Sequence, residues 1–217
     1  MSDFPASSLR PIDAYRLMTD TIQPRPIALV SSVGADGSRN LSPFSFFNGV
    51  GSNPPSLVIS VAAKRGDSPE KDTLRNIRET GEFVVGLVSE ETVEKANQAS
   101  FEYAAGVSEF DAAGFTPLRA TVVKAALIAE SPVNFECRLL QLVPVGEGPG
   151  SATLVVGEIV HFHVDESVAG EGPHRADPEK LRLVGRMGGV FYSRTRDRFE
   201  LARPVSGDPA TAPKVVG

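Results

Sequence analysis

The stretch from Pro24 to Pro55 restricts the possible folds of this chain more than any other stretch. It begins with an apolar run, Ile27 to Val30, which is followed by the polar segment 34–37 with a glycine at each end. An apolar run, a glycine-bounded polar break and a further β-like run are typical of two strands joined by a hairpin turn. The sequence therefore predicts an antiparallel hairpin with strands at 26–33 and about 38–43.

The second half of this stretch combines short hydrogen-bonding side chains with phenylalanines. A core strand would not contain so many amides and hydroxyls, because burying each without a partner costs about 1–3 kcal/mol. Apolar walls with a few polar groups are typical of a site for a flat ligand with polar edges. Alternatively, these polar side chains only satisfy the backbone of a turn. The residues concerned are Asn40, Ser42, Ser45 and Asn48, with Phe44, Phe46 and Phe47 among them.

Short strands dominate the rest of the sequence, and the helices are few and brief. We find no internal repeat and no regular alternation of strands with helices, which favours an antiparallel barrel with peripheral helices over a doubly wound sheet. Further strands are predicted at 56–61, 82–88, 121–128, 134–143 and 152–164. Helices are predicted at 11–18, 70–81, 108–114 and 178–181, and from Ser89, as N-cap, to about Ser100.

The 217 residues are most simply one domain at 1–203, followed by a flexible tail at 204–217. A formal net charge of −5 disfavours binding to nucleic acid or to an anionic membrane. We expect a cytoplasmic protein, because no apolar run approaches the roughly 20 residues of a membrane helix and the first residues lack a signal-peptide pattern. Cys137, the single cysteine, lies in an apolar run and is predicted to be buried and inert.

The familiar motifs of nucleotide binding and nucleophilic catalysis are missing from the sequence. There is no Walker A loop, the segment 185–189 does not match G-x-G-x-x-G, and no serine stands in G-x-S-x-G. His161 and His163 would point to the same face of a strand, as two metal ligands could. Only one further histidine, His174, is present. We therefore predict no metal site and name no catalytic side chain.

The triplet Lys71-Asp72-Thr73 stands near the start of the helix predicted at 70–81. The free N–H groups of a helix start, the positive end of its dipole, an ammonium and a hydroxyl together suit a phosphate. The alternative is an ordinary helix start in which Asp72 complements the dipole. Groups that could contact a second anionic or planar ligand are Arg25, Arg186 and Tyr192.

Four segments together resemble the flavin reductase-like family, whose fold is the FMN-binding split barrel. Two of them, NLSPFSFFNGVGSNPP at 40–55 and EKDTLRNIRETGEFVV at 70–85, are specific enough to make chance a poor explanation. The others are PRPIALVSS at 24–32 and GRMGGVFY at 185–192. With their order and spacing along the chain, these segments extend the resemblance over roughly residues 10–200.

The resemblance implies a mainly β fold, a six-stranded antiparallel Greek-key barrel with peripheral helices. It also implies a homodimer that binds FMN, or FAD in its place, near the dimer interface. By position, Asn40, Ser42 and Ser45 would line the flavin ring and ribityl chain, and Asn48 would lie at the ring edge. Lys71, Asp72 and Thr73 would hold the phosphate, and Arg186 would lie near the cofactor or the incoming donor.

Three residues depart from the pattern of the family. Ser42 stands where many relatives have alanine, Gly86 where asparagine is common, and Ala96 where methionine is frequent. These departures leave FMN as the expected cofactor and bear on the choice of substrate and donor.

The resemblance implies an NAD(P)H-dependent flavin reductase, in which a nicotinamide nucleotide gives hydride to the flavin and the reduced flavin serves a partner monooxygenase. The flavin supplies the redox chemistry and the protein supplies position and electrostatics. Two alternatives remain open at this point. One is a flavoredoxin-like electron carrier with bound FMN, and the other is a non-catalytic split-barrel protein that binds a different ligand.

Overall fold

The structure is a computed structural model, and it describes residues 2–63, 70–104 and 107–201. Its helices are α1 (Pro11–Thr21), α2 (Asp72–Thr80), α3 (Val93–Gln98), α4 (Glu109–Ala113) and α5 (Pro178–Leu181), with 3-10 turns η1 (Ala6–Ser8) and η2 (Glu166–Val168). Its strands are β1 (Ala28–Val33), β2 (Arg39–Phe44), β3 (Phe47–Ser52), β4 (Pro55–Ala62), β5 (Glu82–Leu87), β6 (Pro117–Leu118), β7 (Leu127–Ile128), β8 (Val133–Val145), β9 (Ala152–Val164), β10 (Val184–Arg186) and β11 (Tyr192–Arg194).

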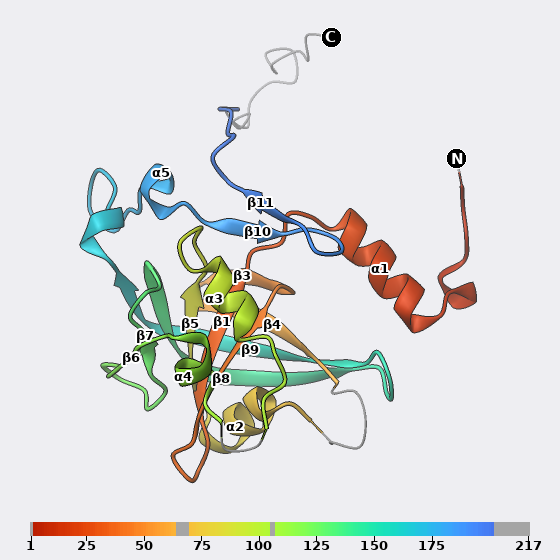
Figure 1. The fold of residues 1–217 in the computed structure, drawn as a ribbon, viewed down its shortest axis with the longest axis horizontal. Coiled ribbons are helices and arrows are strands. Elements are labelled where there is room, and N and C mark those ends of the chain that lie inside the picture. Colours follow the sequence, from red (N-terminus) through yellow and green to blue (C-terminus); the bar gives the residue numbers. More distant parts are fainter. Residues whose placement is uncertain (1, 64–69, 105–106, 202–217) are drawn as a thin grey trace.

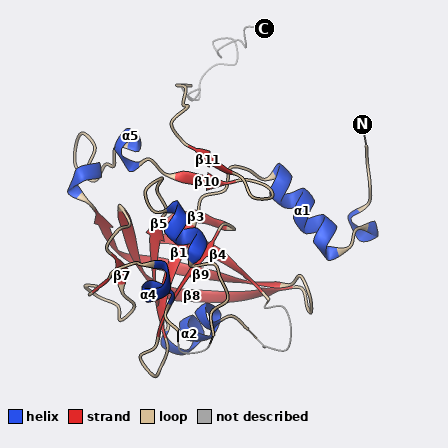
Figure 2. Cartoon of the chain, viewed as in Figure 1, coloured by secondary structure: helices blue, strands red, loops and turns tan. Residues whose placement is uncertain are grey.

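The main sheet closes into a barrel, as Figures 1 and 2 show. Its seven strands pair in the order β2-β1-β5-β8-β9-β4-β3. Strands β2 and β3 lie at opposite ends of this order, yet only Ser45 and Phe46 separate them in the chain. The sheet therefore curves back on itself, and the Ser60 N–H donates to the Phe46 carbonyl (2.8 Å) where it closes. The predicted β-barrel with peripheral helices is confirmed, whereas six strands result only if β2 and β3 are counted as one.

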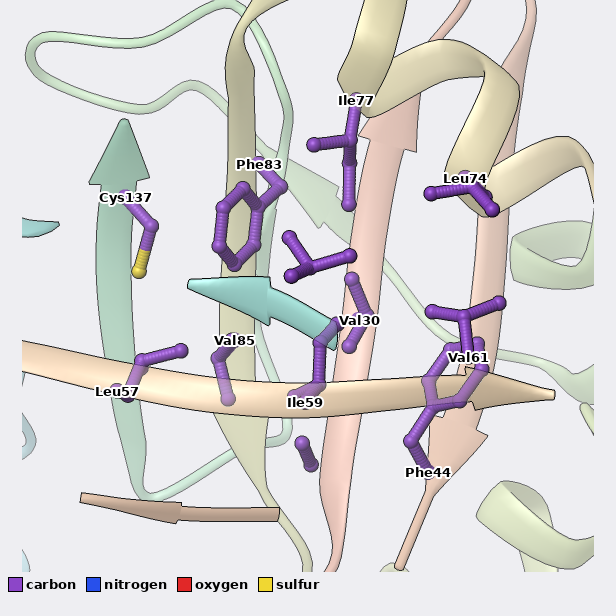
Figure 3. Packing of buried hydrophobic residues seen from close by; sticks show 12 residues of the cluster. Val30, Phe44, Leu57, Ile59, Val61, Leu74, Ile77, Phe83, Val85 and Cys137 are labelled. Atoms are coloured by element: carbon purple, nitrogen blue, oxygen red, sulfur yellow. The ribbon is translucent and has the colours of Figure 1, made fainter. Parts of the chain in front are cut away.

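The predicted hairpin at the start of the barrel is confirmed, with β1 and β2 joined through the turn at 34–37. Both faces of β1 are buried, which explains why its sequence is a continuous apolar run. Ala28 and Val30 belong to the cluster inside the barrel, shown in Figure 3. Leu29 belongs to a second cluster that α3 and α4 cover. Alternate residues of one strand thus connect the barrel interior to its outer helices.

Helix α2 covers one end of the barrel (Figure 1). Leu74 and Ile77, three residues apart, enter the inner cluster together with Phe83 of β5. Gly81 ends the helix with a φ of 71°, a conformation that costs glycine little. The predicted apolar stripe and the predicted glycine stop are both confirmed.

The strand predicted at 121–128 is wrong except for its last two residues, which form β7. The buried carboxylate of Glu136, on β8, accepts hydrogen bonds from the backbone N–H groups of Thr121 (2.8 Å), Val122 (2.6 Å) and Val123 (2.9 Å). Because a backbone N–H satisfied in this way is not free for a strand ladder, the segment bends around the carboxylate instead.

The helix predicted at 89–100 is shorter than expected, since α3 spans only Val93–Gln98. Ser89 does not cap it. The Ser89 N–H donates to the Thr92 hydroxyl (3.0 Å), and Ser89 forms an isolated bridge with Leu183. A contact between distant parts of the chain therefore holds this turn in a non-helical form.

Three further observations complete the fold. Cys137 is fully buried, as predicted, and burial raises the pKa of its thiol. Within the described ranges, the structure contains no helix of the length and apolarity that crossing a membrane would require. The predicted tail at 204–217 lies outside the described residues, as does most of the loop at 63–69.

Candidate flavin site

A pocket of about 200 Å³ lies beside the point where the barrel closes. It combines apolar walls with hydroxyl and amide groups and one cation, the composition expected for a planar ligand with polar edges. Because ligand pockets are typically about 300–1,000 Å³, this pocket suits a ring rather than a whole nucleotide. Its lining residues are Ile27, Pro43, Ser45, Val93, Ala96, Asn97, Ser100, Arg186 and Tyr192.

The β10–β11 hairpin provides the cationic side of the pocket. The Arg186 guanidinium lies 4.6 Å from the centre of the Tyr192 ring, and donates to the carbonyls of Phe191 (2.7 Å) and Gly189 (2.6 Å). The Tyr192 hydroxyl donates to Asn97 Oδ1 on α3 (3.2 Å). Arg186 is therefore held in place before any ligand arrives, and the hairpin is linked to the helix that forms the opposite wall.

Arg25 lies behind this hairpin and joins three parts of the fold. Its guanidinium donates to the carbonyls of Thr19 (2.8 Å) and Ile22 (2.6 Å) at the end of α1, and to that of Met187 (3.0 Å) after β10. Its Nε lies 3.5 Å from the Ser45 hydroxyl. Burial lowers the pKa of this guanidinium, which is only 5% exposed. Arg25 is thus a structural link behind the pocket, with its terminal donors occupied by carbonyl groups.

The predicted phosphate residues lie at the start of α2. Lys71 is the N-cap of α2, and its ammonium lies 5.7 Å from the centre of the Phe44 ring. Phe44 directly precedes Ser45, a pocket residue, and its own ring belongs to the inner cluster. The Asp72 carboxylate pairs with Arg75 one turn further along the helix (2.7 Å).

Thr73 and Asn40 are brought together, but in a buried network. The Thr73 hydroxyl donates to Asn40 Oδ1 (2.7 Å), and the Asn40 amide donates to Glu109 Oε1 (3.0 Å). The other Glu109 oxygen accepts the Leu41 N–H (3.0 Å). Burial raises the pKa of Glu109, although these hydrogen bonds oppose the change. The network locks α2 and α4 onto β2, and a direct contact of Asn40 or Thr73 with a cofactor stays a prediction.

The two remaining predicted residues lie on the strands that flank the closing point. Ser42 is half-buried on β2, where it pairs with Val30. Asn48 is exposed on β3, and its side chain accepts the N–H of Gly49 (2.8 Å). Neither residue lines the pocket, so their contact with a ligand also stays a prediction.

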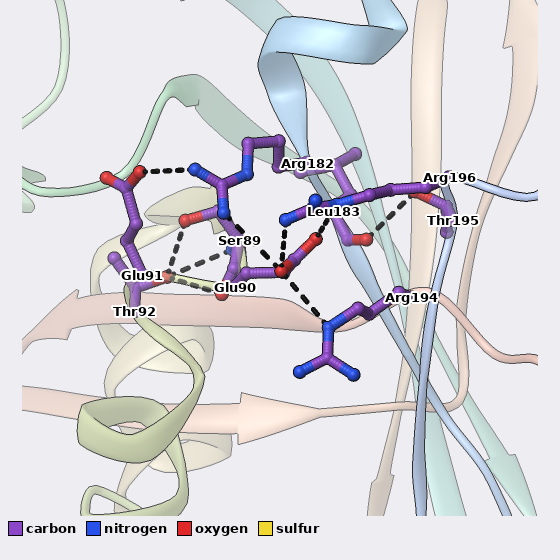
Figure 4. Close-up of polar contacts among 9 residues, drawn as sticks. All are labelled: Ser89, Glu90, Glu91, Thr92, Arg182, Leu183, Arg194, Thr195 and Arg196. Atoms are coloured by element: carbon purple, nitrogen blue, oxygen red, sulfur yellow. Dashed lines mark hydrogen bonds and ion pairs between the residues drawn. The ribbon is translucent and has the colours of Figure 1, made fainter.

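An ion-pair cluster fixes the far end of the β10–β11 hairpin (Figure 4). Glu90, in the turn before α3, accepts two hydrogen bonds from Arg196 (both 2.6 Å) and one from Arg194 (3.2 Å). Arg182 lies 3.5 Å from the same carboxylate and also pairs with Glu91 (3.2 Å). The Arg196 guanidinium lowers the pKa of the Glu90 carboxyl, so this carboxyl is ionised at neutral pH.

A second cavity, of about 550 Å³, lies elsewhere. It is an open hollow beside the 117–126 segment and contains none of the predicted site residues.

The two histidines considered as metal ligands make other contacts. His163 Nε2 is hydrogen-bonded to Glu136 Oε1 (2.6 Å), and the centre of its ring lies 4.5 Å from that of His161. Among the residues that the structure covers, no group of three or more His, Cys, Asp or Glu side chains is arranged to hold a metal.

A family model described as a flavin reductase like domain matches residues 21–195. The chain belongs to this family. Nitrilotriacetate monooxygenase component B from Bacillus cereus is similar in structure, with a TM-score of 0.86 and 34% identity over 93% of this chain and 98% of that one. The 2-nitrobenzoate 2-nitroreductase of Pseudomonas fluorescens is also similar, with a TM-score of 0.84 and 33% identity over 96% of this chain and 100% of that one.

A third solved structure, a split-barrel-domain protein from Shewanella frigidimarina NCIMB 400, has a TM-score of 0.79 and 23% identity over 94% of this chain and 100% of that one. This last similarity shows the fold alone, and it confirms the split barrel that the sequence predicts.

Sequence reasoning missed several residues of the site. Asn97 reaches the pocket from α3 and Ser100 from just after it, and Glu90 fixes the hairpin that closes it. Their positions depend on how α3 packs beside β2, which no local pattern reveals. The only sequence signal was the polar spacing of Asn97 and Ser100 within a helix whose other face is apolar.

Proposed function

We propose that this flavin reductase-like protein is an NAD(P)H-dependent reductase that binds FMN, with FAD as the alternative. The observation that supports this most is the pocket at the closing point of the barrel. Its walls are apolar, its polar groups come from Ser45, Asn97 and Ser100, and Arg186 is fixed at its edge. Family membership supports a flavin as the ligand.

The residues present fit the cofactor. The pocket would take part of the isoalloxazine ring, whose edge can accept hydrogen bonds from hydroxyl and amide donors. Lys71 and the N–H groups at the start of α2 would hold the phosphate. Asn40, Ser42, Asn48, Asp72 and Thr73 are the further residues we propose for this site.

Bound flavin would accept hydride from the nicotinamide nucleotide and pass the electrons on. The chain itself contributes position and charge. Arg186 adds positive charge beside the ring, and this favours a reduced, anionic ligand. The walls formed by Ile27, β2 and α3 would limit the orientation of a planar ring in this pocket. No side-chain acid or base is needed for hydride transfer, which agrees with the lack of a catalytic triad in the sequence.

We also propose a homodimer in the cytoplasm that supplies a monooxygenase. The similarity to a monooxygenase component supports the partner class. The exposed apolar side chains of α1 and of the β10–β11 turn support self-association.

The test is an absorbance titration with FMN, followed by NADH or NADPH without air. Because the chain has no tryptophan, changes in protein fluorescence do not complicate the flavin signal. A spectrum that shifts on binding and bleaches with either nucleotide is the expected result. Bound flavin that neither nucleotide bleaches would instead identify the electron carrier, and a spectrum unchanged by the protein would exclude flavin binding.

Lys71 offers a sharper test of the phosphate end. We expect Lys71→Ala to weaken FMN binding about tenfold, since a hydrogen bond to a charged group contributes about 1.5–3 kcal/mol. Riboflavin, which lacks the phosphate, should bind the variant and the wild type equally. Lys124→Ala, at the open hollow away from the pocket, is the control. Equal loss of riboflavin and FMN would place Lys71 somewhere other than at the phosphate.

A further inference from the structure

Alternate residues of β11 and its extension reach α3 and the turn that precedes it. Tyr192 reaches Asn97 at the pocket, whereas Arg194 and Arg196 reach Glu90 in the turn before the helix. Alternate residues of a strand are about 7 Å apart on one face. A row of side chains therefore leads away from the pocket, with an aromatic ring first and guanidinium groups after it.

The cations in this row are only partly neutralised. Arg182, Arg194 and Arg196 converge on Glu90, and Glu91 pairs only with Arg182. Glu179 also acts on Arg196 and pairs with Arg198, so four guanidinium groups face three carboxylates. Figure 4 shows the side chain of Arg194 reaching Glu90 through Nε alone. Its two terminal nitrogens have no acceptor among the described residues, and 75% of the side chain is exposed.

Stability alone is a weak reason for this arrangement. Exposed ion pairs contribute about 0–1 kcal/mol each, and three guanidinium groups around one carboxylate repel one another. Glu90, only 12% exposed, instead holds the guanidinium groups at fixed positions with unused donors. Planar guanidinium groups with free donors are well suited to phosphate, which they bind through paired hydrogen bonds.

The position of the row fits the shape of a nicotinamide dinucleotide. Such a ligand carries a planar ring at one end, a ribose next, and then its phosphate groups. A nicotinamide ring over the pocket, beside Tyr192, would direct the phosphates along β11. We propose that Arg194 and Arg196 bind the phosphate groups of the electron donor, either the pyrophosphate or the 2′-phosphate. This inference rests on the proposed function.

The test measures binding directly, without any flavin reaction. Calorimetry would compare ADP-ribose, which carries the pyrophosphate, with 2′,5′-ADP, which carries the 2′-phosphate, on the wild type and on Arg194→Gln/Arg196→Gln. We expect the variant to lose about tenfold in affinity for at least one probe. Loss for both probes would assign the adenosine 5′-phosphate, which both carry, and loss for ADP-ribose alone would assign the rest of the pyrophosphate. Loss for 2′,5′-ADP alone would assign the 2′-phosphate and a preference for NADPH.

The control is Arg10→Gln/Arg16→Gln, which removes the same charge from a cluster on α1 where two arginines share Asp13. Its affinities should match the wild type. The proposal would be overturned if the wild type and Arg194→Gln/Arg196→Gln bound both probes with equal affinity. It would also be overturned if the wild type bound neither probe. If the double variant does not fold, the single variant Arg194→Gln tests the proposal instead. Arg194 makes a single contact with Glu90, so its loss should disturb the fold least.

The same design separates this proposal from the function on which it rests. A wild type that binds the probes through Arg194 and Arg196, but does not reduce flavin with NADH or NADPH, would retain the phosphate site and reject the reductase. Normal flavin reduction by the double variant, with a KM for both nucleotides equal to that of the wild type, would retain the reductase and reject the phosphate site.

Discussion

Ala96 determines how much space the pocket has on the side of α3. It is 3% exposed and lines the pocket. A longer side chain would fill the space that we assign to the ring. We expect Ala96→Met to weaken FMN binding by about 1–3 kcal/mol, the usual cost of overfilling a packed site.

Fluorescence titration with FMN would measure this effect. Ala99→Met is the control, because Ala99 is equally buried beneath the same helix but does not line the pocket. If both variants bound FMN as the wild type does, the ring would have to lie elsewhere.

Glu136 makes the stability of the fold depend on pH. Burial would raise the pKa of this carboxyl, but hydrogen bonds from His163 and from three backbone N–H groups lower it from 4.5 to about 2. A carboxyl pKa that is lower in the folded than in the unfolded state stabilises the fold at pH values above the unfolded-state pKa. This stability is lost as the pH falls from about 4.5 toward 2. The loss is on the order of 3 kcal/mol.

Urea unfolding between pH 7 and pH 3 would check this prediction. Glu136→Gln should be less stable by about 1–3 kcal/mol at pH 7, and its deficit should shrink as the pH falls. Glu147→Gln, an exposed substitution in the β8–β9 turn, should follow the wild type. An unchanged pH dependence in Glu136→Gln would show that other carboxyls control acid unfolding.

At the scale of elements, β5 packs so closely against β7 and the turn after it that a side chain at Gly86 would force its neighbours to shift. A Cβ there would lie 2.7 Å from Ile128 Cδ1 and 2.9 Å from the Ser131 hydroxyl. This close packing gives a physical reason for the glycine in this chain. We expect Gly86→Ala to lower the free energy of unfolding by about 1–3 kcal/mol.

Denaturant melts would test Gly86→Ala against Gly49→Ala. Gly49 lies on β3, where an added Cβ meets no atom within 4 Å. Equal stability of the two variants would mean that the turn at 128–131 moves freely away from β5.

For the whole molecule, the main prediction concerns its assembly. Helix α1 extends away from the barrel beside the β10–β11 hairpin (Figure 1). Ile22 at its end is 57% exposed, and Phe191 in the hairpin turn is 71% exposed. Apolar side chains exposed in this way are typical of an interaction surface. We expect light scattering to give twice the chain mass for the wild type.

Ile22→Glu/Phe191→Glu should then give a single chain mass, because burying a carboxylate without a partner is costly. Leu118→Glu, an exposed position on β6, should stay a dimer. A wild type that is monomeric at micromolar concentration would contradict the assembly.

The sequence was enough to predict the barrel, because apolar runs such as Ile27–Val30 and the stripe of Leu74 and Ile77 carry the periodicity of their elements. It did not predict the bend around Glu136 or the shortened α3. In both places, backbone donors meet partners far away in the chain. For the same reason it predicted Arg186, which lines the pocket, but neither Asn97 nor Glu90, whose positions depend on tertiary contact, while the role of Lys71 stays a prediction.

Arg25 also has a consequence for how the chain is made. Its guanidinium joins α1 to the carbonyl of Met187, 162 residues later. At about 5–20 residues per second, a ribosome needs roughly 8–30 s to make that acceptor. During this interval the first helix has no C-terminal hairpin against which to dock. The N-terminal segment is therefore fixed only near the end of synthesis, and a nascent chain stalled before Met187 would leave it open to a protease or a chaperone.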